Sequence, residues 1–166
     1  FQNHYGDQYG RMPVEYEKSP MQRILKQGSA GMEWQIDNKG NPGKIKQFEY
    51  FTNSSSNENL KVKLWIVDGT TCEYSDYYIA NQLYVTKVTD EDQKVIYEFK
   101  DKLGQVVLKR MLDGNTRYDT YYVYDDFGLL RFVISPEGSN RIACSFDISN
   151  TLARELVYFY TYDGRK

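Results

Sequence analysis

The sequence predicts a mainly β protein: an antiparallel sheet of consecutive β-hairpins with one short helix near the C-terminus. Three observations support this fold class. The 166 residues include 16 Tyr, 8 Phe and 2 Trp but only 4 Pro, and aromatic side chains favour the pleated surface of a sheet. Several segments alternate apolar and polar residues, which is the period of a half-buried strand. Turn-forming residues separate these segments every 8 to 15 residues or so, roughly the spacing of hairpins.

The first half of the chain contains a polar opening segment and four predicted strands. Residues 1–18 are rich in Gly and Tyr and lack sustained periodicity, so we separate them from a β domain over 19–166. The Gly- and Pro-containing tract 37–43 predicts a turn, because its residues tolerate positive φ or preset φ. The polar tract 53–59 predicts an exposed hairpin loop. The four strands are expected at 23–26, 32–36, 44–52 and 60–67.

The last of these strands has the clearest alternation. Its apolar residues recur at every second position, so we expect them to share one face of the sheet. These residues are Leu60, Val62, Leu64 and Ile66.

The second half of the chain predicts six more strands and the helix. A Tyr-rich stretch at 74–78 is expected to be irregular, and Pro136 is expected to end a run of strand. The helix is predicted over 149–156, with Ser149 as its N-cap. The six strands are expected at 84–88, 95–99, 106–108, 118–124, 129–134 and 157–162.

Composition and charge narrow the class of protein. The 21 basic and 23 acidic residues give a net charge of −2, which argues against a nucleic-acid partner, because such binding needs clustered Lys and Arg on phosphate. No apolar run approaches the roughly 20 residues that span a bilayer, so we do not expect membrane insertion. The hydrophobic fraction of 40% is too high for a disordered chain.

Residues that carry chemistry are sparse. Cys72 and Cys144 are open to two interpretations, one disulfide or two separate thiols, and two cysteines do not complete a metal site. His4 is the only histidine and lies in the polar opening segment, where we expect it to be solvated. We therefore predict no metal and no other cofactor.

A turn signature recurs along the chain: an aromatic strand, an Asp, a Gly three residues later and an apolar strand. In such a unit the Asp bonds the backbone of the turn, the Gly takes a conformation that other residues resist, and the aromatics stack across strands. A degenerate copy is expected at 16–25. The signature residues are Phe99, Asp101 and Gly104 in one copy, Tyr122, Tyr124, Asp125 and Gly128 in a second, and Tyr160, Tyr162 and Asp163 in a third.

These copies resemble the YD repeats of the Rhs and YD-repeat proteins, which are large bacterial cell-surface or secreted chains. Lys166 stands where the third copy would have its Gly, and the copies are unevenly spaced, so we do not expect a regular solenoid. The resemblance covers most of the chain from Tyr16 onward. The stretches most similar to one Rhs-like subgroup are 27–34, 81–84, 97–110, 119–128 and 158–165.

The resemblance implies antiparallel sheets that curl into a hollow β-shell. It also implies that this chain is an internal fragment of a larger surface or secreted protein, in which it is a structural segment of the wall and its partner is the rest of the parent chain. Because a cut sheet has open edges, we expect the last strand to pair internally or with a second copy, giving a homodimer.

The alternative function is a carbohydrate- or protein-binding module that uses exposed aromatics. Aromatic side chains suit this role because each offers a large contact area, and Tyr and Trp add a polar group. Trp34 and Trp65 are the stacking candidates, followed by Tyr74, Tyr77 and Tyr78.

Enzymatic activity is not expected. Asp125 with Asp126, and the acidic run 90–92, are the nearest approach to a catalytic carboxylate pair, and both fit turn chemistry better. The single histidine argues against a Ser-His-Asp set. A calcium site built from Asp90, Asp92 or Asp125 is a further alternative, although their spacing matches no EF-hand loop.

Overall fold

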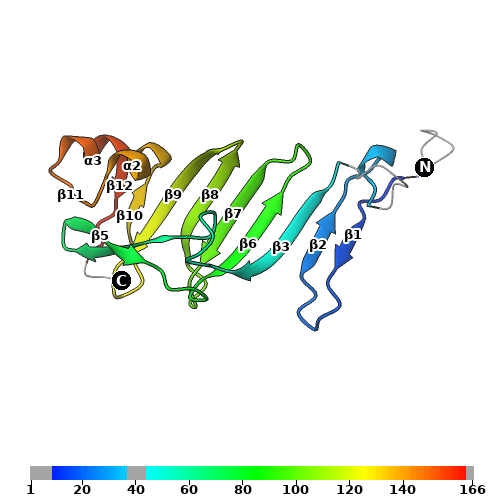
Figure 1. The fold of residues 1–166 in the computed structure, drawn as a ribbon, viewed down its shortest axis with the longest axis horizontal. Coiled ribbons are helices and arrows are strands. Elements are labelled where there is room, and N and C mark those ends of the chain that lie inside the picture. Colours follow the sequence, from blue (N-terminus) through cyan, green and yellow to red (C-terminus); the bar gives the residue numbers. More distant parts are fainter. Residues whose placement is uncertain (1–8, 37–43, 164–166) are drawn as a thin grey trace. The chain divides into compact units, whose positions relative to one another are not determined.

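The computed structural model describes residues 9–36 and 44–163 (Figure 1). His4 and the turn predicted at 37–43 lie outside these residues. The strands are β1 (Val14–Tyr16), β2 (Ile24–Gln27), β3 (Lys46–Thr52), β4 (Lys63–Asp68), β5 (Thr71–Tyr77), β6 (Tyr84–Thr89), β7 (Val95–Lys100), β8 (Val106–Asp113), β9 (Thr116–Tyr124), β10 (Leu130–Ile134), β11 (Ser145–Asp147) and β12 (Val157–Phe159); the helices are η1 (Met32–Trp34), α2 (Pro136–Arg141) and α3 (Thr151–Leu156).

The predicted fold class is confirmed, since the described chain is mainly antiparallel strand with short helices. It divides into two compact units, one of residues 1–50 and 86–96 and one of residues 51–85 and 97–166. Strands β3, β6 and β7 have residues in both units.

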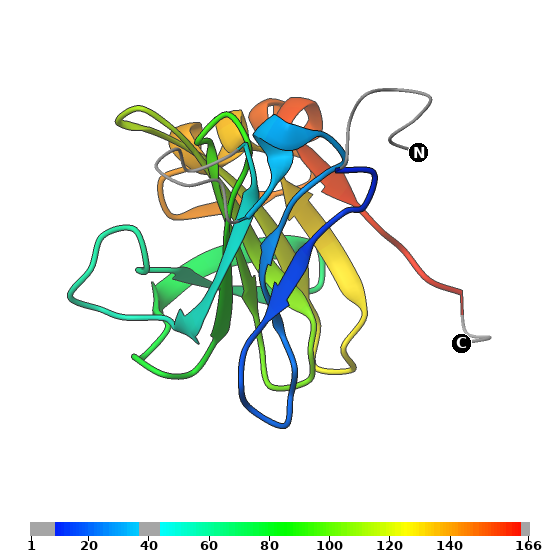
Figure 2. The ribbon, with the colours of Figure 1, turned by 90° about the vertical axis from the view of Figure 1, so that its right-hand side faces the viewer.

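In the smaller unit, β1 and β2 form an antiparallel hairpin, drawn in blue in Figure 2. The pairing of Glu15 with Lys26 places their side chains 2.9 Å apart in an ion pair. Strand β2 then pairs with β3. Part of the polar opening segment is therefore strand, which its short length and lack of periodicity did not reveal.

Residues 32–36 were expected to form a strand, and this expectation is wrong: Met32–Trp34 is the 3₁₀ helix η1. Gly31 turns the chain at φ 110°, and the Gln35 amide donates to the carbonyls of Ser29 and Gly31 at 3.2 and 3.0 Å. These local hydrogen bonds stabilise a turn of the backbone in place of pairing with a neighbouring strand.

The larger unit has a main sheet in which β7, β8, β9, β10 and β12 are successive neighbours. Strands β8 and β9 pair from Leu108 with Tyr121 to Asp113 with Thr116, so both are longer than predicted. A two-residue loop joins them because Gly114 adopts φ 56°, as the first central residue of a tight hairpin turn. The last strand, β12, pairs internally with β10.

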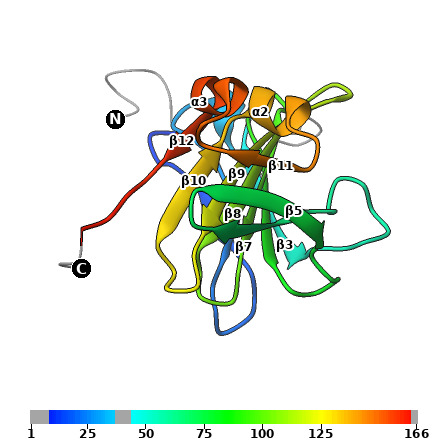
Figure 3. The same ribbon diagram turned by 90° about the vertical axis from the view of Figure 1, so that its left-hand side faces the viewer.

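A second sheet of the larger unit has the order β11, β5, β4. Strand β5 covers most of the stretch at 74–78 that was expected to be irregular; this expectation is wrong because β5 pairs on one side with β4 and on the other with β11. Figure 3 shows β5 running across β8, β9 and β10. The three-residue β11 gave no periodic signal in the sequence.

The core of the larger unit is an aromatic cluster between these two sheets. Trp65 on β4 meets Tyr121 on β9 with ring centroids 6.1 Å apart, and Phe146 on β11 meets Phe132 on β10 at 5.2 Å. Both contacts are edge-to-face, the geometry that the ring quadrupoles favour. All four side chains are buried.

The common face predicted for Leu60, Val62, Leu64 and Ile66 is wrong. Val62 is fully buried, but Ile66 is 44% exposed and its neighbour Trp65 is buried instead. Val62 precedes β4, which begins at Lys63, so the two-residue period that places Trp65 on the buried face does not extend back to Val62.

The helix near the C-terminus is present as α3, but its cap is Asn150, whose side chain accepts from Leu152 N–H at 2.9 Å. Ser149 instead donates its backbone N–H to Asp147. Helix α2 was not expected. Ser135 caps it by accepting from Gly138 N–H at 3.1 Å, and Pro136 fits the first helical position, where no N–H is needed.

A buried guanidinium ties the two sheets together. The Arg110 side chain, 3% exposed, forms a bidentate pair with Asp119 at 2.7 and 2.6 Å. Its Nη1 also donates to three backbone carbonyls of the segment that leads into β4. These acceptors are Glu58, Asn59 and Lys61.

Replacing Arg110 by Met should lower the free energy of unfolding by about 3 kcal/mol, because the change leaves the half-buried Asp119 without its counter-charge. Urea denaturation followed by tryptophan fluorescence measures the loss. The neighbouring Lys109 is exposed, and Lys109→Met should change stability by no more than about 0.5 kcal/mol. Equal losses in the two variants would contradict a central role for Arg110.

Candidate functional site

The turn after β7 is built around one carboxylate oxygen. Asp101 Oδ1 accepts from the N–H groups of Leu103 at 2.9 Å and Gln105 at 2.8 Å. The Asp101 N–H donates to the Gln105 carbonyl at 2.9 Å, and Gly104 N–H donates to the Asp101 carbonyl at 3.1 Å. Gly104 has φ 84°, a left-handed conformation that glycine adopts without steric cost.

The turn between β9 and β10 repeats this arrangement. Asp125 Oδ1 accepts from Phe127 N–H at 3.0 Å and Leu129 N–H at 2.9 Å, and Gly128 has φ 74°. The backbone bonds from Asp125 to Leu129 and from Gly128 to Asp125 are also present, at 2.9 and 2.8 Å. The two clearest copies of the sequence signature therefore form the same turn.

A third turn of this kind follows β6. Asp90 Oδ1 accepts from Asp92 N–H at 2.9 Å and Lys94 N–H at 2.8 Å. Gln93 takes the position of the glycine, with φ 64°, and donates its N–H to the Asp90 carbonyl at 3.1 Å. Sequence reasoning treated 90–92 as an ordinary turn because the Gly was missing. The signal that could have identified this copy is Asp90 itself, which lies four residues before Lys94, the last residue of the turn.

The turns at Asp101 and Asp125 are in direct contact. The Gln105 side chain donates from Nε2 to the Gly128 carbonyl at 2.8 Å. A Cβ added at Gly128 would lie 3.2 Å from the same nitrogen. Gly128 therefore serves both the left-handed backbone and the close approach of the neighbouring turn.

The degenerate copy at 16–25 forms a longer turn around Glu17. Its carboxylate accepts from Arg23 at 2.8 and 2.9 Å and from the Ser19 hydroxyl at 2.5 Å. The bonds from Arg23 and then from Ser19 lower the pKa of Glu17 to about 2. A glutamate thus takes the place of the turn aspartate when the loop is longer.

The predicted third copy continues the pairing of β12 with β10. Tyr160 donates its N–H to the Arg131 carbonyl at 2.9 Å, and the Tyr162 hydroxyl donates to the Leu130 carbonyl at 2.9 Å. Asp163 is among the described residues, but the residues after it are not.

Aromatic residues that flank the turns differ in burial. Phe99 is fully buried, while Tyr122 and Tyr124 are half-buried and Tyr124 donates its hydroxyl to the Val106 carbonyl at 3.1 Å. Tyr160 and Tyr162 are 41% and 47% exposed. Both are therefore exposed residues, with slightly more than half of their surface covered. Tyr158 on β12 is an exception at 68% exposed.

Of the two stacking candidates, Trp65 does not present a ring face to solvent. It is 7% exposed, and rings from both sheets surround it. In the part of the chain that the structure describes, its indole N–H is the buried side-chain group without a hydrogen-bond partner. Trp34 is half-buried, with the Lys44 ammonium 5.5 Å from its ring.

The tyrosines of and after β5 are packed as well. The Tyr74 and Tyr77 rings lie edge-to-face with centroids 5.5 Å apart. The Lys61 ammonium lies 4.1 Å from the centroid of Tyr77, a cation–π contact. Tyr78 is half-buried.

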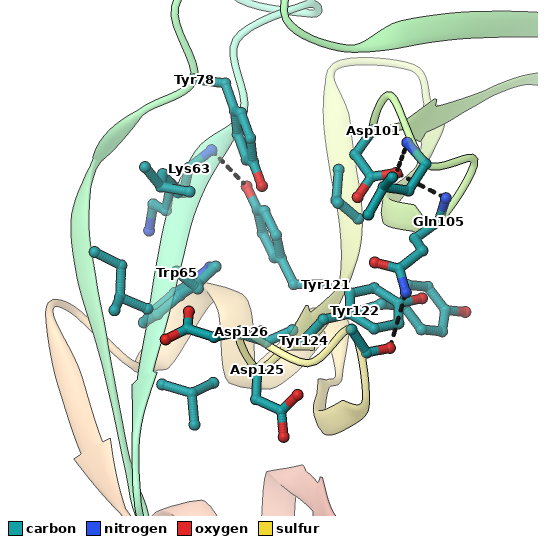
Figure 4. A pocket seen from close by; sticks show the side chains of 17 residues that line it. Lys63, Trp65, Tyr78, Asp101, Gln105, Tyr121, Tyr122, Tyr124, Asp125 and Asp126 are labelled. Atoms are coloured by element: carbon teal, nitrogen blue, oxygen red, sulfur yellow. Dashed lines mark hydrogen bonds between the residues drawn. The ribbon is translucent and has the colours of Figure 1, made fainter.

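The two turns in contact border a cavity of about 320 Å³ between the sheets of the larger unit (Figure 4). Trp65, Tyr78 and Tyr121 lie on one side, and Asp101 and Gln105 lie on the other. The cavity thus combines aromatic rings with a carboxylate and an amide. Sequence reasoning missed it because its walls come from segments far apart in the chain.

Three side chains of this cavity, Tyr78, Tyr121 and Asp125, have pKa values shifted further from neutral pH. Burial raises the pKa of Tyr121, and burial followed by the Asp101 charge raises the pKa of Tyr78. Both phenols therefore remain protonated. Burial alone would raise the pKa of Asp125, but the N–H groups of Leu129 and Phe127, with the Arg131 guanidinium, hold it below its usual value.

The two cysteines and the possible metal ligands remain to be placed. Cys72 is buried and Cys144 is exposed, and both are free thiols. Burial raises the pKa of Cys72 to about 12, so its thiol is unreactive. Among residues 9–36 and 44–163, no group of three or more His, Cys, Asp or Glu side chains could hold a metal ion.

Comparison with family models, curated proteins and solved structures finds no match to this chain. In the described residues, no helix has the length and apolar character needed to cross a membrane.

If the three Asp-centred turns are equivalent, replacing Gln by Gly at the left-handed position of one turn and Gly by Gln at the same position of another should change stability in opposite directions. Gln93→Gly should raise the free energy of unfolding by about 0.5 kcal/mol, because it removes the left-handed strain of a residue with a Cβ. Gly104→Gln should lower it by about 1 kcal/mol for the same reason. Urea denaturation measures both.

The control is Lys102→Gly, which introduces glycine into the Asp101 turn at a residue that does not have positive φ. It should only destabilise, through the greater freedom of the unfolded chain. If Gln93→Gly behaved like Lys102→Gly, the equivalence of the Asp90 turn would be refuted.

Asp125 should make stability depend on pH. Because its pKa is lower in the folded chain, the stabilisation is present above the unfolded value of about 4 and is lost as the pH falls through the folded value. The difference in free energy of unfolding between the wild type and Asp125→Asn should therefore shrink as the pH falls below about 5. Urea titrations across this range measure it. Asp126→Asn, at an exposed neighbour, is the control, and a gap for Asp125→Asn that stays constant would contradict the prediction.

Proposed function

We propose that this chain is a non-enzymatic structural segment of a large cell-surface or secreted protein of the Rhs and YD-repeat kind, where it forms part of the wall of a β-shell. The observation that carries the proposal is the Asp-centred turn, which recurs three times with the same pattern of hydrogen bonds. A repeated turn of this kind suits a sheet that grows by adding hairpins.

Packing of the repeat supports a structural role. The turns at Asp101 and Asp125 bond to each other through Gln105, and the strands that they join carry the buried Phe99 and the core residue Tyr121. Each hairpin therefore rests on the next, which a single hairpin in water needs for stability.

The chemistry of the cavity supports a non-enzymatic role. Tyr78 and Tyr121 have raised pKa values, and Asp125 has a lowered one. A general acid or base at neutral pH needs a pKa near 7, and each of these shifts moves the group away from that value.

The outer edge of β12 is the proposed site of contact with a partner strand. Strand β12 is the last neighbour in its sheet, and its outer edge is where a strand from the rest of the parent chain, or from a second copy, would pair. Exposed Tyr158 on this strand would then gain a cross-strand neighbour.

Electron cryomicroscopy of the full parent protein tests the proposal. We expect these residues in the wall of a hollow β-shell, with a further strand paired on the outer edge of β12. In the same parent, Asp101→Ala combined with Asp125→Ala should increase tryptic cleavage, because both turns lose their side-chain bonds, whereas exposed Asp126→Ala, which leaves every trypsin site in place, should not. A parent in which these residues form a separate domain outside any shell would refute the proposal.

A further inference from the structure

We propose that a polar cavity beside the start of β4 binds a tetrahedral dianion of the phosphate or sulfate class. The cavity has a volume of about 190 Å³ and lies within the larger unit. Its lining residues come from the segment 58–63, the end of β5, β8, β9 and α2. The volume is below the roughly 300–1,000 Å³ of pockets that hold drug-sized ligands, so the cavity suits a small ion.

Positive charge predominates in this cavity. Four cationic side chains and two carboxylates line it, which gives a net charge of +2, whereas the whole chain has a net charge of −2. Arg110 and Asp119 bond to each other, so the excess comes from three other cations that face Glu58. These three are Lys61, Lys63 and Arg117. Because this charge is confined to one cavity, it matches a small dianion rather than an extended nucleic acid.

The Arg117 guanidinium is held in place and keeps free donors. Arg117, Asp119 and Tyr121 stand at every second position of β9, which places them on one face of the sheet. Arg117 Nη1 donates to the Glu58 carbonyl at 2.7 Å. A guanidinium has five N–H donors, so this bond fixes the group and leaves most of its donors for a ligand. Two oxygens of a phosphate or sulfate can accept a parallel pair of such N–H bonds.

The ammonium groups of Lys61 and Lys63 lie against aromatic rings. Lys61 Nζ is 4.1 Å from the ring centroid of Tyr77, and Lys63 Nζ is 5.5 Å from the ring centroid of Tyr74. A cation–π contact of this kind attracts the cation but does not neutralise its charge. Both ammonium groups therefore keep N–H donors for an anion.

Glu58 balances these cations only weakly. Its carboxylate oxygens lie 3.9 Å from Lys61 Nζ and 3.9 Å from Arg117 Nη1, which is beyond hydrogen-bond distance. The Glu58 side chain is also 71% exposed. A dianion in the cavity would bond the same cations at shorter distances, so Glu58 competes with the ligand and its removal should strengthen binding.

The test is a titration of the ¹⁵N-labelled chain at pH 7, followed by NMR, with the ionic strength kept at about 0.15 M by sodium chloride. Sodium sulfate, sodium phosphate and sodium acetate are added separately to about 20 mM, which detects a millimolar Kd. Sulfate and phosphate should shift the backbone N–H signals of Lys61 and Arg117 in a saturable way and leave that of Gly104 unchanged. Acetate, which carries one charge, should bind about fivefold more weakly or worse.

Glycerol 3-phosphate, titrated alike, distinguishes two sources of the same chemical group. A lower Kd than that of inorganic phosphate identifies the ligand as a phosphate ester. An equal or higher Kd identifies it as the free ion.

Two charge variants and a matched control locate the site. Lys61→Gln removes one of the excess cations and should raise the sulfate Kd about fivefold. Glu58→Gln removes the competing carboxylate and should lower the Kd about threefold, while the backbone carbonyl that accepts from Arg110 stays in place. Lys102→Gln changes the net charge of the chain as Lys61→Gln does, but in the exposed Asp101 turn, and it should bind sulfate as the wild type does.

Three results would overturn the proposal. Signals that do not saturate, or that respond equally to sulfate and acetate, would show general screening in place of a dianion site. Equal losses in Lys61→Gln and Lys102→Gln would assign the effect to the overall charge of the chain. An unchanged or weaker affinity in Glu58→Gln would place the anion outside this cavity. Because the cavity lies wholly within the larger unit, none of these results bears on the wall proposal.

Discussion

The arrangement of the larger unit depends on the buried guanidinium of Arg110. It is held by Asp119 from the neighbouring strand, so its direction is fixed before the second sheet is considered. Its remaining donors then fix the carbonyls of 58–61 against β8 and β9. This segment leads directly into β4, and the position of β4 decides where Trp65 lies. A buried charge is costly unless its donors are satisfied. Because the Arg110 donors are satisfied only when these carbonyls lie against β8 and β9, few alternative positions are left for the second sheet.

The aspartate turns act at the other end of the same strands. Each one closes a hairpin with a fixed number of residues, so it also fixes the register of the two strands that it joins. The register determines which residues face the aromatic core, Tyr121 and Val123 on β9 among them. The turns and Arg110 are therefore complementary constraints: the first set strand pairing within one sheet, and the second sets how the other sheet lies upon it.

Much of this fold could be predicted from the sequence, because alternation and turn residues are local signals. The strands at 84–88, 95–99 and 129–134 are present almost as expected. The failures have physical causes that are not local. Strand β4 begins only after Val62, where pairing with β5 starts, and the Asp90 turn has Gln where the signature requires Gly. The site was the least predictable part, because Trp65 and Asp101 meet only after two sheets have packed.

The turn motif also shows how a structural element can acquire a second role. Its hydrogen bonds need a single carboxylate oxygen, so the other oxygen is available for whatever lies beside the turn. At Asp125 it faces Arg131, which in turn bonds the Tyr160 carbonyl and supports the edge of the sheet. At Asp101 it faces the cavity (Figure 4). The same residue type, required at both positions for the same backbone reason, thus contributes to packing in one turn and offers an open acceptor in the other. Asparagine would keep an oxygen acceptor for the turn, although its bonds lack the added strength of a charged acceptor, and it would replace the outward oxygen with an N–H₂ group.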